Sequence, residues 1–435
     1  RWIVSQRFSA IIVPGLRLTN TIGLDTYMDE RRTYENERPW RTAQGLASGG
    51  TRQEKINRSQ INNDLVLSLD GVQLNENFNL SGLVGGNIWM QERNYIRGTG
   101  DDIVIPDFYN LSNFEDQRVS ADLKEKQRLL GAFGQATLDY RGWGYLTVTG
   151  RNDWSSTLPT ANNNYFYPSA SLGVVFTDAF NFRPWWLQYG KVRLSYAKVG
   201  NDAPAYSLSS RYYSASAPGV HQGWYQNDPT TISFPFQGQV GYTQGTQLGN
   251  PDIKPESTTE IEFGLELNGL NNRASLEVAY YEKKSYDMIF SVPSSATTGY
   301  TSIVRNAGDL RNEGWEVSLR GRPIQMNDLT WDLAANWTRN RNDVLELAPG
   351  VDNLHLAGYS WPSIRIMEGL PYGVIWGYGY QRNCDPKTGD YCFPDMPKGA
   401  LILGDENCAS VRYNQTGDCY GLPIRTQRQI PLGSA

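Results

Sequence analysis

The chain has 435 residues, of which 39% are hydrophobic and 12% aromatic, with 40 Lys and Arg against 45 Asp and Glu. Mean hydropathy is -0.51 and no run of about 18 apolar residues occurs, which excludes a helical membrane protein. The net charge of -5 argues against nucleic acid as the main partner. The length of the chain is compatible with two or three soluble domains or with one large β structure.

Apolar and polar side chains alternate residue by residue in about eleven segments, a period typical of β-strands. In residues 165–177, for example, Phe166 and Leu172 share one face while Tyr167 and Ser171 share the other. The clearest segments, in chain order, are residues 16–25, 79–88, 130–140, 146–154, 165–177, 191–196, 260–267, 275–281, 315–322 and 329–338.

Each segment is about ten residues long, as a tilted strand needs to cross a bilayer, and many apolar faces end in an aromatic residue. The polar faces carry full charges. We therefore predict a transmembrane antiparallel β-barrel with lipid outside and salt-bridge ladders facing a water-filled lumen. The predicted lumen-lining residues are Arg151, Asp153, Arg193, Glu260, Glu262, Glu266, Glu316 and Arg320.

The connections are predicted to alternate in length, which is the topology of an outer-membrane barrel. Short turns are expected at residues 70–77, 141–144, 269–273 and 323–328, and long loops near residues 39–53, 97–127, 201–257 and 287–309. Residues 177–189 are intermediate and are expected to hold a small helical turn. A soluble β-sandwich alternates in the same way, but its strands are shorter and its loops lack this asymmetry.

The loop at residues 201–257 is the best candidate for a binding surface, because it sets aromatic rings among Ser, Gln, Asn and Gly. Aromatic faces stack on sugars or peptides, and amides supply hydrogen bonds. The alternative is a purely structural role, in which these rings pack the loop into a stable cap or against a partner. The candidate residues are Tyr206, Tyr212, Tyr213, His221, Trp224, Tyr225, Phe234, Phe236 and Tyr242.

The alternation of apolar and polar residues weakens past residue 342. Residues 1–345 are therefore assigned to transmembrane barrel strands with long surface loops, and residues 346–435 to an aromatic-rich segment and a cysteine-containing loop of the same barrel. The four cysteines are Cys384, Cys392, Cys408 and Cys419. Their clustering suggests disulfides in an oxidising compartment. Three pairings are open, of which Cys384–Cys392 with Cys408–Cys419 closes the shortest loops. A zinc site is the alternative, although no C-x₂-C spacing occurs.

No catalytic constellation stands out. The two histidines, His221 and His355, both lie in predicted loops, and neither a phosphate-binding glycine loop nor a G-x-S-x-G motif occurs. The carboxylates of Glu260, Glu262 and Glu266 could suggest paired catalytic acids, but their spacing puts them along one strand face. We therefore expect no enzyme.

Several motifs in residues 130–345 resemble the SusC/RagA family of TonB-dependent outer-membrane transporters. They occur in the family's order. The motifs are Gly150–Ser156 with Tyr165–Ser171, then Asp178–Phe180, Lys191–Tyr196, Gly200–Asn201, Asn250–Glu256 and Asn306–Glu316.

The resemblance implies a 22-stranded barrel in the outer membrane of a Gram-negative bacterium, closed by an N-terminal plug and fed by a SusD-like surface lipoprotein. It implies TonB-driven import of oligosaccharides or peptides. The sequence has no Met at its start, no plug, no TonB box and about half of the family's strands. It is therefore expected to be the middle to later barrel of a longer protein, reaching TonB through a plug outside this chain.

After residue 380 the family usually carries a short Asp/Asn/Gly-rich turn. Here residues 385–390 and 404–407, both acidic, surround the cysteines instead. Calcium is one candidate ligand of this 385–407 loop and no other cofactor is expected. The EF-hand spacing is missing, so a plain polar loop is the alternative.

Two functions are therefore compared. The first is a barrel that imports large nutrients. The second is a surface β-rich module that binds glycans or peptides, or assembles, without transport. They differ in the apolar face of residues 165–177, which lies against lipid in the first and against another sheet in a soluble protein.

Overall fold

The computed structural model describes residues 1–35, 49–214, 239, 241–358, 362–378 and 430–434. The chain divides into two units. The first comprises Arg1–Tyr281, Asp287–Asn306 and Trp315–Thr338, and the second Glu282–Tyr286, Ala307–Gly314 and Arg339–Ala435. Each is described by itself.

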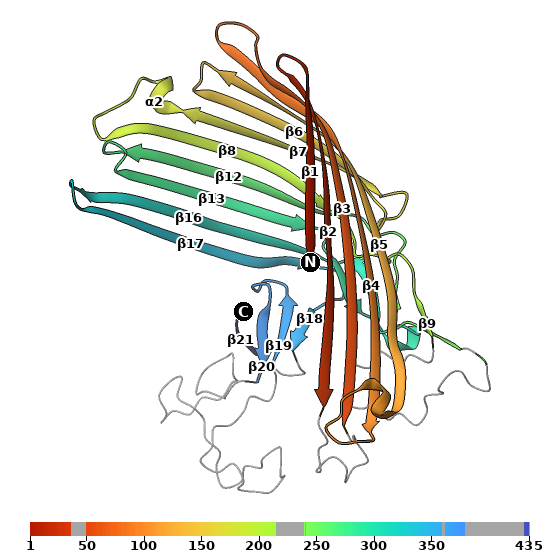
Figure 1. Cartoon of the computed structure of the whole chain (residues 1–435). Helices are drawn as coiled ribbons and strands as arrows, with labels where there is room; N and C mark the ends of the chain where they lie inside the picture. Colours follow the sequence, from red (N-terminus) through yellow and green to blue (C-terminus); the bar gives the residue numbers. More distant parts are fainter. Residues whose placement is uncertain (36–48, 215–238, 240, 359–361, 379–429, 435) are drawn as a thin grey trace, which may run out of the picture. The chain divides into compact units, whose positions relative to one another are not determined.

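A single twelve-stranded sheet dominates the structure, and its strands follow one another up and down in chain order (Figure 1). β9 to β11 lie in the connection from β8 to β12, and β14 and β15 in the connection from β13 to β16. The twelve strands are β1 (Trp2–Val13), β2 (Leu16–Glu35), β3 (Gly50–Gln73), β4 (Phe78–Ile103), β5 (Phe114–Tyr140), β6 (Gly144–Ser155), β7 (Asn164–Val175), β8 (Leu187–Asn201), β12 (Glu256–Gly269), β13 (Ala274–Tyr286), β16 (Gly308–Gln325) and β17 (Thr330–Leu347).

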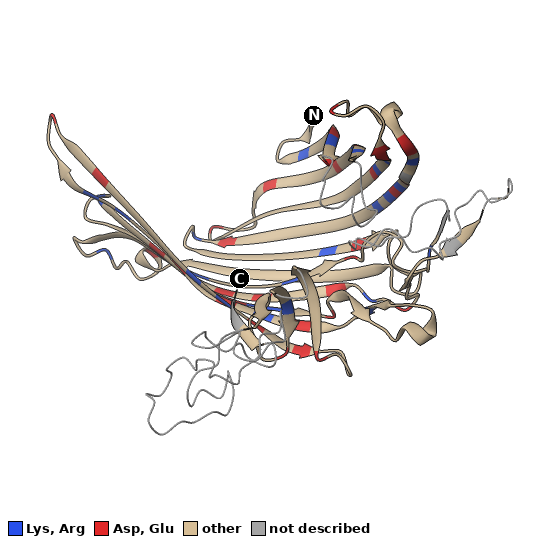
Figure 2. Ribbon diagram, turned by 90° about the horizontal axis from the view of Figure 1, so that it is seen from below, with Lys and Arg blue, Asp and Glu red and all other residues tan. Residues whose placement is uncertain are grey.

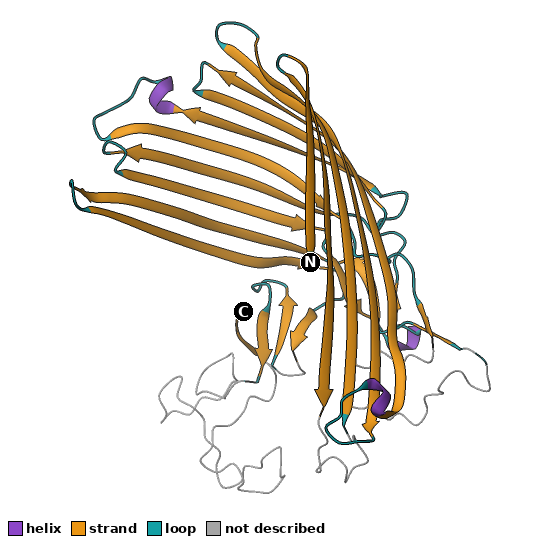
Figure 3. Ribbon diagram, in the orientation of Figure 1, coloured by secondary structure: helices purple, strands orange, loops and turns teal. Residues whose placement is uncertain are grey.

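Within the described residues, nearly all other regular structure consists of short β-strands, and helix occurs only as single turns (Figure 3). β9 (Tyr212–Ser214) pairs with β10 (Tyr242–Gln244), and β15 (Ser302–Asn306) lies between β11 (Gln247–Leu248) and β14 (Ile289–Pro293). The helical turns are η1 (Leu111–Asn113), α2 (Phe176–Ala179) and η2 (Ala296–Thr298). No helix in the described part of the chain is long and apolar enough to cross a membrane.

The predicted all-β, antiparallel architecture is confirmed, but two strands were missed and four are much longer than predicted. β1 and β3 were not among the segments named above, and β2 to β5 contain 20, 24, 26 and 27 residues. The predicted long loop at residues 97–127 is wrong, since β4 continues to Ile103 and β5 begins at Phe114. Polar residues cover both faces of these outer halves, so the alternation that reveals a strand disappears there.

The predicted asymmetry of the connections is present. Residues 14–15, 74–77, 141–143, 270–273 and 326–329 form short turns at one end of the sheet. The longer connections join the other ends of the strands, except for residues 176–186 between β7 and β8, which lie at the same end as the short turns. The helical turn predicted within 177–189 is confirmed as α2, which begins one residue earlier. There the Arg183 guanidinium donates to Asp178 at 2.6 Å and lowers the pKa of that carboxyl, so the contact stabilises the turn at neutral pH and is lost on acidification.

The apolar face of the sheet is open surface. Register places Leu146, Leu172, Leu194 and Phe263 in one row across β6, β7, β8 and β12. These side chains are 45%, 46%, 50% and 45% exposed. In a sandwich such a row would be the core, so the soluble alternative does not fit. The polar face begins one residue away with Thr147, Ser171, Ser195 and Glu262, in the same register.

Aromatic rings gather where β4 and β5 approach their short turns. Phe78 and Tyr140 are opposite each other in the register, with ring centroids 4.9 Å apart, and Trp143 packs edge-on against Tyr140 at the same distance. This is the interfacial position in which barrels carry aromatic girdles.

The second unit holds a four-stranded sheet in the order β18 (Asn353–Gly358), β19 (Ser363–Met367), β20 (Val374–Gly377) and β21 (Ile430–Ser434). Its buried side chains include Val344, Leu354, Ile366 and Val374. Arg311 donates to Asp343 at 2.8 Å within this unit. The four cysteines and the proposed calcium loop lie outside the described residues.

Candidate functional site

Basic and acidic residues occur along the strands of the large sheet (Figure 2), and several of them form ion pairs on its polar face. On β6, Arg151 Nε lies 2.8 Å from Asp153 Oδ1, and Tyr167 on β7 donates its hydroxyl to the same carboxylate. The Arg151 guanidinium also lies 5.5 Å from the ring centroid of Phe133 on β5. Gly131 makes room for this group, because a Cβ there would lie 2.5 Å from Arg151 Nη2.

A second cluster centres on Arg193 of β8. Its guanidinium lies 3.2 Å from Glu262 and 3.4 Å from Glu266 on β12, and 3.4 Å from Glu277 on β13. Lys191 adds a 3.7 Å contact with Glu266. Three strands are therefore joined through one cation, in a wall that offers both signs of charge.

Further along the sheet, β16 and β17 continue the polar face. Ser318 Oγ donates to Asn336 at 2.9 Å, and Arg322 Nε to Asp332 at 2.6 Å. Glu316 and Arg320 lie on the same strand and are exposed. Seven of the predicted lumen-lining residues therefore lie on one face in three groups: Arg151 with Asp153, Arg193 with Glu262 and Glu266, and Glu316 with Arg320. The eighth, Glu260, lies two residues before Glu262 on β12 and so on the same face. The role of these residues in contacting cargo stays a prediction.

In β3 and β4 the polar face is rich in amides. Asn87 Nδ2 donates to Asn62 at 2.8 Å and to Asp64 at 2.6 Å. Nearer the long connections, Glu54 accepts from the Tyr95 hydroxyl at 2.8 Å and from Arg97 Nε at 2.9 Å. Such a wall can bind polar, uncharged cargo by hydrogen bonding.

The base of the 201–257 loop is held by Asp202. One of its carboxylate oxygens, Oδ2, accepts from Gln127 Nε2 at 2.9 Å, from Thr157 Oγ1 at 3.0 Å and from the Ser155 hydroxyl. Ser155 and Thr157 are almost fully buried. The carboxylate therefore joins β5, the turn after β6 and the start of the loop.

Apolar packing secures the other side of this base. Ile253 is completely buried in a cluster with Leu158, Ala203 and Val304, against which Tyr165 packs. Asn306 binds both the amide and the carbonyl of Lys254, at 3.0 and 2.9 Å. The family-like stretches at 250–256 and 306–316 thus contain residues that anchor the connections between strands.

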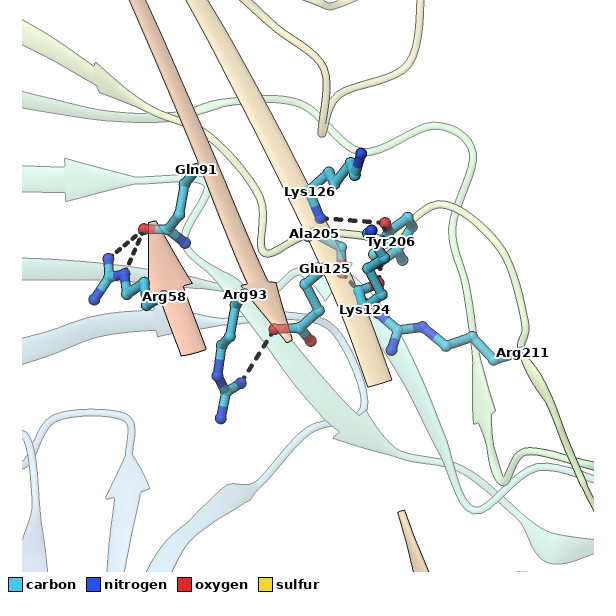
Figure 4. A network of polar contacts seen from close by, with 9 residues as sticks. All are labelled: Arg58, Gln91, Arg93, Lys124, Glu125, Lys126, Ala205, Tyr206 and Arg211. Carbon is cyan, nitrogen blue, oxygen red and sulfur yellow. Dashed lines mark hydrogen bonds and ion pairs between the residues drawn. The ribbon is translucent and has the colours of Figure 1, made fainter. Parts of the chain in front are cut away.

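Tyr206 has an unexpected position, shown in Figure 4. Its hydroxyl lies 3.3 Å from the Lys126 amide and 3.4 Å from the Lys124 carbonyl, so it can accept from one and donate to the other. β6 pairs with β5 only as far as Leu129, so these groups lie on an edge that β6 does not cover. Arg211 lies 4.8 Å from the Tyr206 ring and donates to Ala205.

The other predicted binding residues are placed only in part. Tyr212 and Tyr242, on β9 and β10, are 68% and 72% exposed. Tyr213 pairs with Thr243 in the same ladder. His221, Trp224, Tyr225, Phe234 and Phe236 lie outside the described residues. The cargo-binding role of this set therefore remains a prediction.

Sequence reasoning missed Phe133, Tyr167, Asp202 and Asn306 as members of these networks. The motifs contain Tyr167 and Asn306, and Asp202 directly follows one, but which groups they meet depends on strands and connections far apart in the chain. In the described part of the chain, no three His, Cys, Asp or Glu residues are grouped as for a metal ion.

Comparison with known proteins adds an independent finding. A family model described as the TonB-dependent receptor-like β-barrel matches residues 13–420. TonB-dependent receptor P39 of Formosa agariphila is 26% identical over 421 residues, covering 95% of this chain and 37% of that protein. TonB-dependent receptor SusC of Bacteroides thetaiotaomicron is 27% identical over 238 residues, covering 52% of this chain and 22% of that protein.

Among solved structures, the RagAB peptide transporter superposes with a TM-score of 0.71 at 19% identity, covering 99% of this chain and 44% of that chain. At this identity the likeness concerns the fold. The chain spans less than two-fifths of the length of the curated relatives it matches.

Proposed function

Since the chain belongs to the TonB-dependent receptor β-barrel family and so to the outer membrane of a Gram-negative bacterium, we propose that it forms part of the wall of a nutrient importer. In this role the apolar face of the sheet meets lipid and the polar face lines the path of the cargo.

One observation carries this proposal. The row Leu146, Leu172, Leu194 and Phe263 is exposed, while the row one residue away is polar and lies beside the Arg193 cluster. Proteins surrounded by water rarely expose a large continuous apolar band on their surface. A strand wall between lipid and water needs both faces as they are.

The proposed cargo is a large polar nutrient, an oligosaccharide or a peptide. The amide-rich wall around Asn62 and Asn87 and the exposed rings of Tyr212 and Tyr242 support polar and stacking contacts. We further propose a SusD-like surface lipoprotein as partner at the long connections, and TonB as the energy source, acting through a plug domain contributed by the rest of the protein. The protein acts as a transporter without enzymatic chemistry of its own.

The alternative function is a surface module that binds glycans or peptides without moving them. Both functions use the same binding loop, so binding measurements alone do not distinguish them. Energy-dependent accumulation of the nutrient in the cell is expected only of the importer.

The test uses the complete receptor in its own outer membrane. Cells with and without the gene are given labelled oligosaccharide and labelled peptide mixtures, with and without an uncoupler of the proton gradient. We expect uptake of one mixture to require both the gene and the gradient. Binding that is gene-dependent but insensitive to the uncoupler would favour the surface module, and recovery of the receptor outside the outer-membrane fraction would overturn both interpretations.

A further inference from the structure

The apolar face has a sharp border across β2, β3 and β4. Register places Leu24, Ile61 and Met90 in one row. The next row on the same face, two residues farther from the short turns, is Thr26, Ser59 and Glu92. The side chains of these rows change from apolar to polar within a single step of the ladder, and Met28 and Ile96 are isolated apolar side chains beyond it.

The depth of the apolar band fits a bilayer. On β4 it runs from Phe78 beside the short turn to Met90, about 40 Å of strand at roughly 3.3 Å per residue. At a tilt of about 45° this strand crosses about 30 Å, the thickness of the hydrocarbon core. The border after Met90 therefore marks the level of the lipid headgroups on the side of the long connections.

Basic side chains of β5 occupy this level. Arg128, Lys126 and Lys124 lie opposite Met90, Glu92 and Asn94 in the register, and all three are exposed on the apolar face of the sheet.

Glu92 positions two of these cations. Its carboxylate oxygens lie 2.9 Å from Lys124 Nζ and 3.1 Å from Lys126 Nζ, while the lysine side chains remain 59% and 49% exposed. Three cations of β5 therefore face the Glu92 carboxylate of β4. Asp122 of β5 lies on the same face, one row farther from the apolar band and opposite Ile96. The surplus is positive and is held close to the apolar band.

A groove lies beside these basic residues at the border of the apolar band. This groove, of about 270 Å³, is lined by Ile61 and Met90 at its apolar end and by Glu92, Lys126 and Arg128 at its charged end. A second groove, of about 410 Å³, is lined by Phe166, Lys198 and Lys254 near the long-connection ends of β7, β8 and β12. The second groove also contains Glu256 and Asp287, so its two basic residues are balanced by two acidic ones.

We propose that Lys124, Lys126 and Arg128 bind the phosphate groups of an outer-leaflet glycolipid whose acyl chains lie against Ile61 and Met90. Ammonium and guanidinium groups form strong charge-assisted hydrogen bonds with phosphate. Because the cations adjoin the apolar band directly, the occupant is amphipathic, and a free anion would leave the apolar end of the groove uncovered. The inference rests on the proposed membrane-spanning role and adds a specific lipid contact, which fixes the depth of the wall in the bilayer.

The test compares the complete receptor with the double variant Lys126→Gln/Arg128→Gln in neutral phosphatidylcholine nanodiscs doped with a phosphorylated glycolipid. We expect the apparent affinity of the double variant for that lipid to be about 25-fold lower than that of the wild type, since each of the two basic residues near a charged membrane surface contributes about a fivefold factor. The same glycolipid after phosphatase treatment should bind weakly and equally to both proteins.

The matched control is Arg93→Gln/Arg97→Gln, which removes the same charge near this level but from the polar face and outside the groove, where Arg93 pairs with Glu125 and Arg97 pairs with Glu54. It should keep wild-type lipid affinity. Equal affinity of the first double variant and the wild type, or full displacement of the lipid by inorganic phosphate, would overturn the inference. Heat-modifiable migration checks each variant for a folded barrel. A folded barrel that ignores the lipid refutes this inference alone, whereas a receptor that never reaches the outer membrane refutes the proposed function.

Discussion

Tyr206 shows how one residue can acquire a role that its type does not suggest. A tyrosine in a long loop rich in Ser, Gln and Asn looks like a binding residue. Here its backbone has a φ of 64°, which is rare outside glycine, and its hydroxyl lies on the exposed edge of β5. An uncovered edge strand offers free backbone groups, and the hydroxyl covers two of them.

Replacing Tyr206 with Phe should therefore expose the Lys126 amide while leaving the ring and the Arg211 contact in place. We expect faster hydrogen exchange at residues 124–128 and a loss of about 1 kcal/mol in local stability. Tyr212→Phe, in the same loop but outside this contact, is the control. Unchanged exchange in the Tyr206 variant would mean that the hydroxyl does not protect the edge.

Asp202 offers a second test at the residue scale. Asp202→Ala removes the carboxylate that accepts from the buried hydroxyls of Ser155 and Thr157. These hydroxyls lie 2.9 Å apart and one can donate to the other, so one of them loses its acceptor, at a cost of about 1–3 kcal/mol. Limited proteolysis should cut the base of the 201–257 loop sooner. Asp252→Ala, at an exposed position of the same loop, should behave like the wild type, and a similar cleavage rate in both variants would contradict the anchoring role.

At the scale of the elements, the strands divide into a membrane part and an outer part. From Phe78 to Met90, β4 has an apolar face, and from Glu92 to Ile103 it is largely polar on both faces. Alternation therefore predicted the first half, and the second half was mistaken for loop. The outer halves of β3, β4 and β5 hold together through backbone ladders and pairs such as Arg93–Glu125.

The two faces of β7 give the sharpest prediction at this scale. Leu172→Arg places a charge in the apolar band and should cost about 2–4 kcal/mol if lipid surrounds it. Ser171→Arg, one residue away, points to the polar side and should be tolerated. Heat-modifiable migration of the complete receptor measures assembly of the barrel. Equal assembly of both variants would show that the Leu172 face does not meet lipid.

At the scale of the whole molecule, the two edge strands of the sheet determine whether this chain can form a closed barrel by itself. In the described residues, β1 and β17 are the outer strands of the twelve. Both are exposed along most of their length, including Trp2, Ile11, Trp331 and Trp337. An unpaired edge is not tolerated in lipid, because its backbone groups find no water there. These strands therefore need partners, which the rest of a longer receptor can supply.

We accordingly expect residues 1–435 expressed alone to fail to form a heat-modifiable barrel, whereas the complete receptor forms one. The comparison is made in the same outer membrane at matched expression. A pore formed by the isolated chain, or by two copies of it, would contradict this expectation and would show that β1 and β17 can pair with each other.

The sequence alone determined the fold class, the two faces of most strands and the alternation of short and long connections. It could do so because these features depend on neighbours one or two residues apart. Only the tertiary structure decided which strands pair and in which register, and hence that Arg193 meets Glu277, that Asp202 gathers Gln127 and Thr157, and that Lys126 lies beside Glu92 at the border of the apolar band. Such contacts join residues separated by tens of positions in the sequence. The pattern of neighbouring residues does not determine the strand register that brings them together.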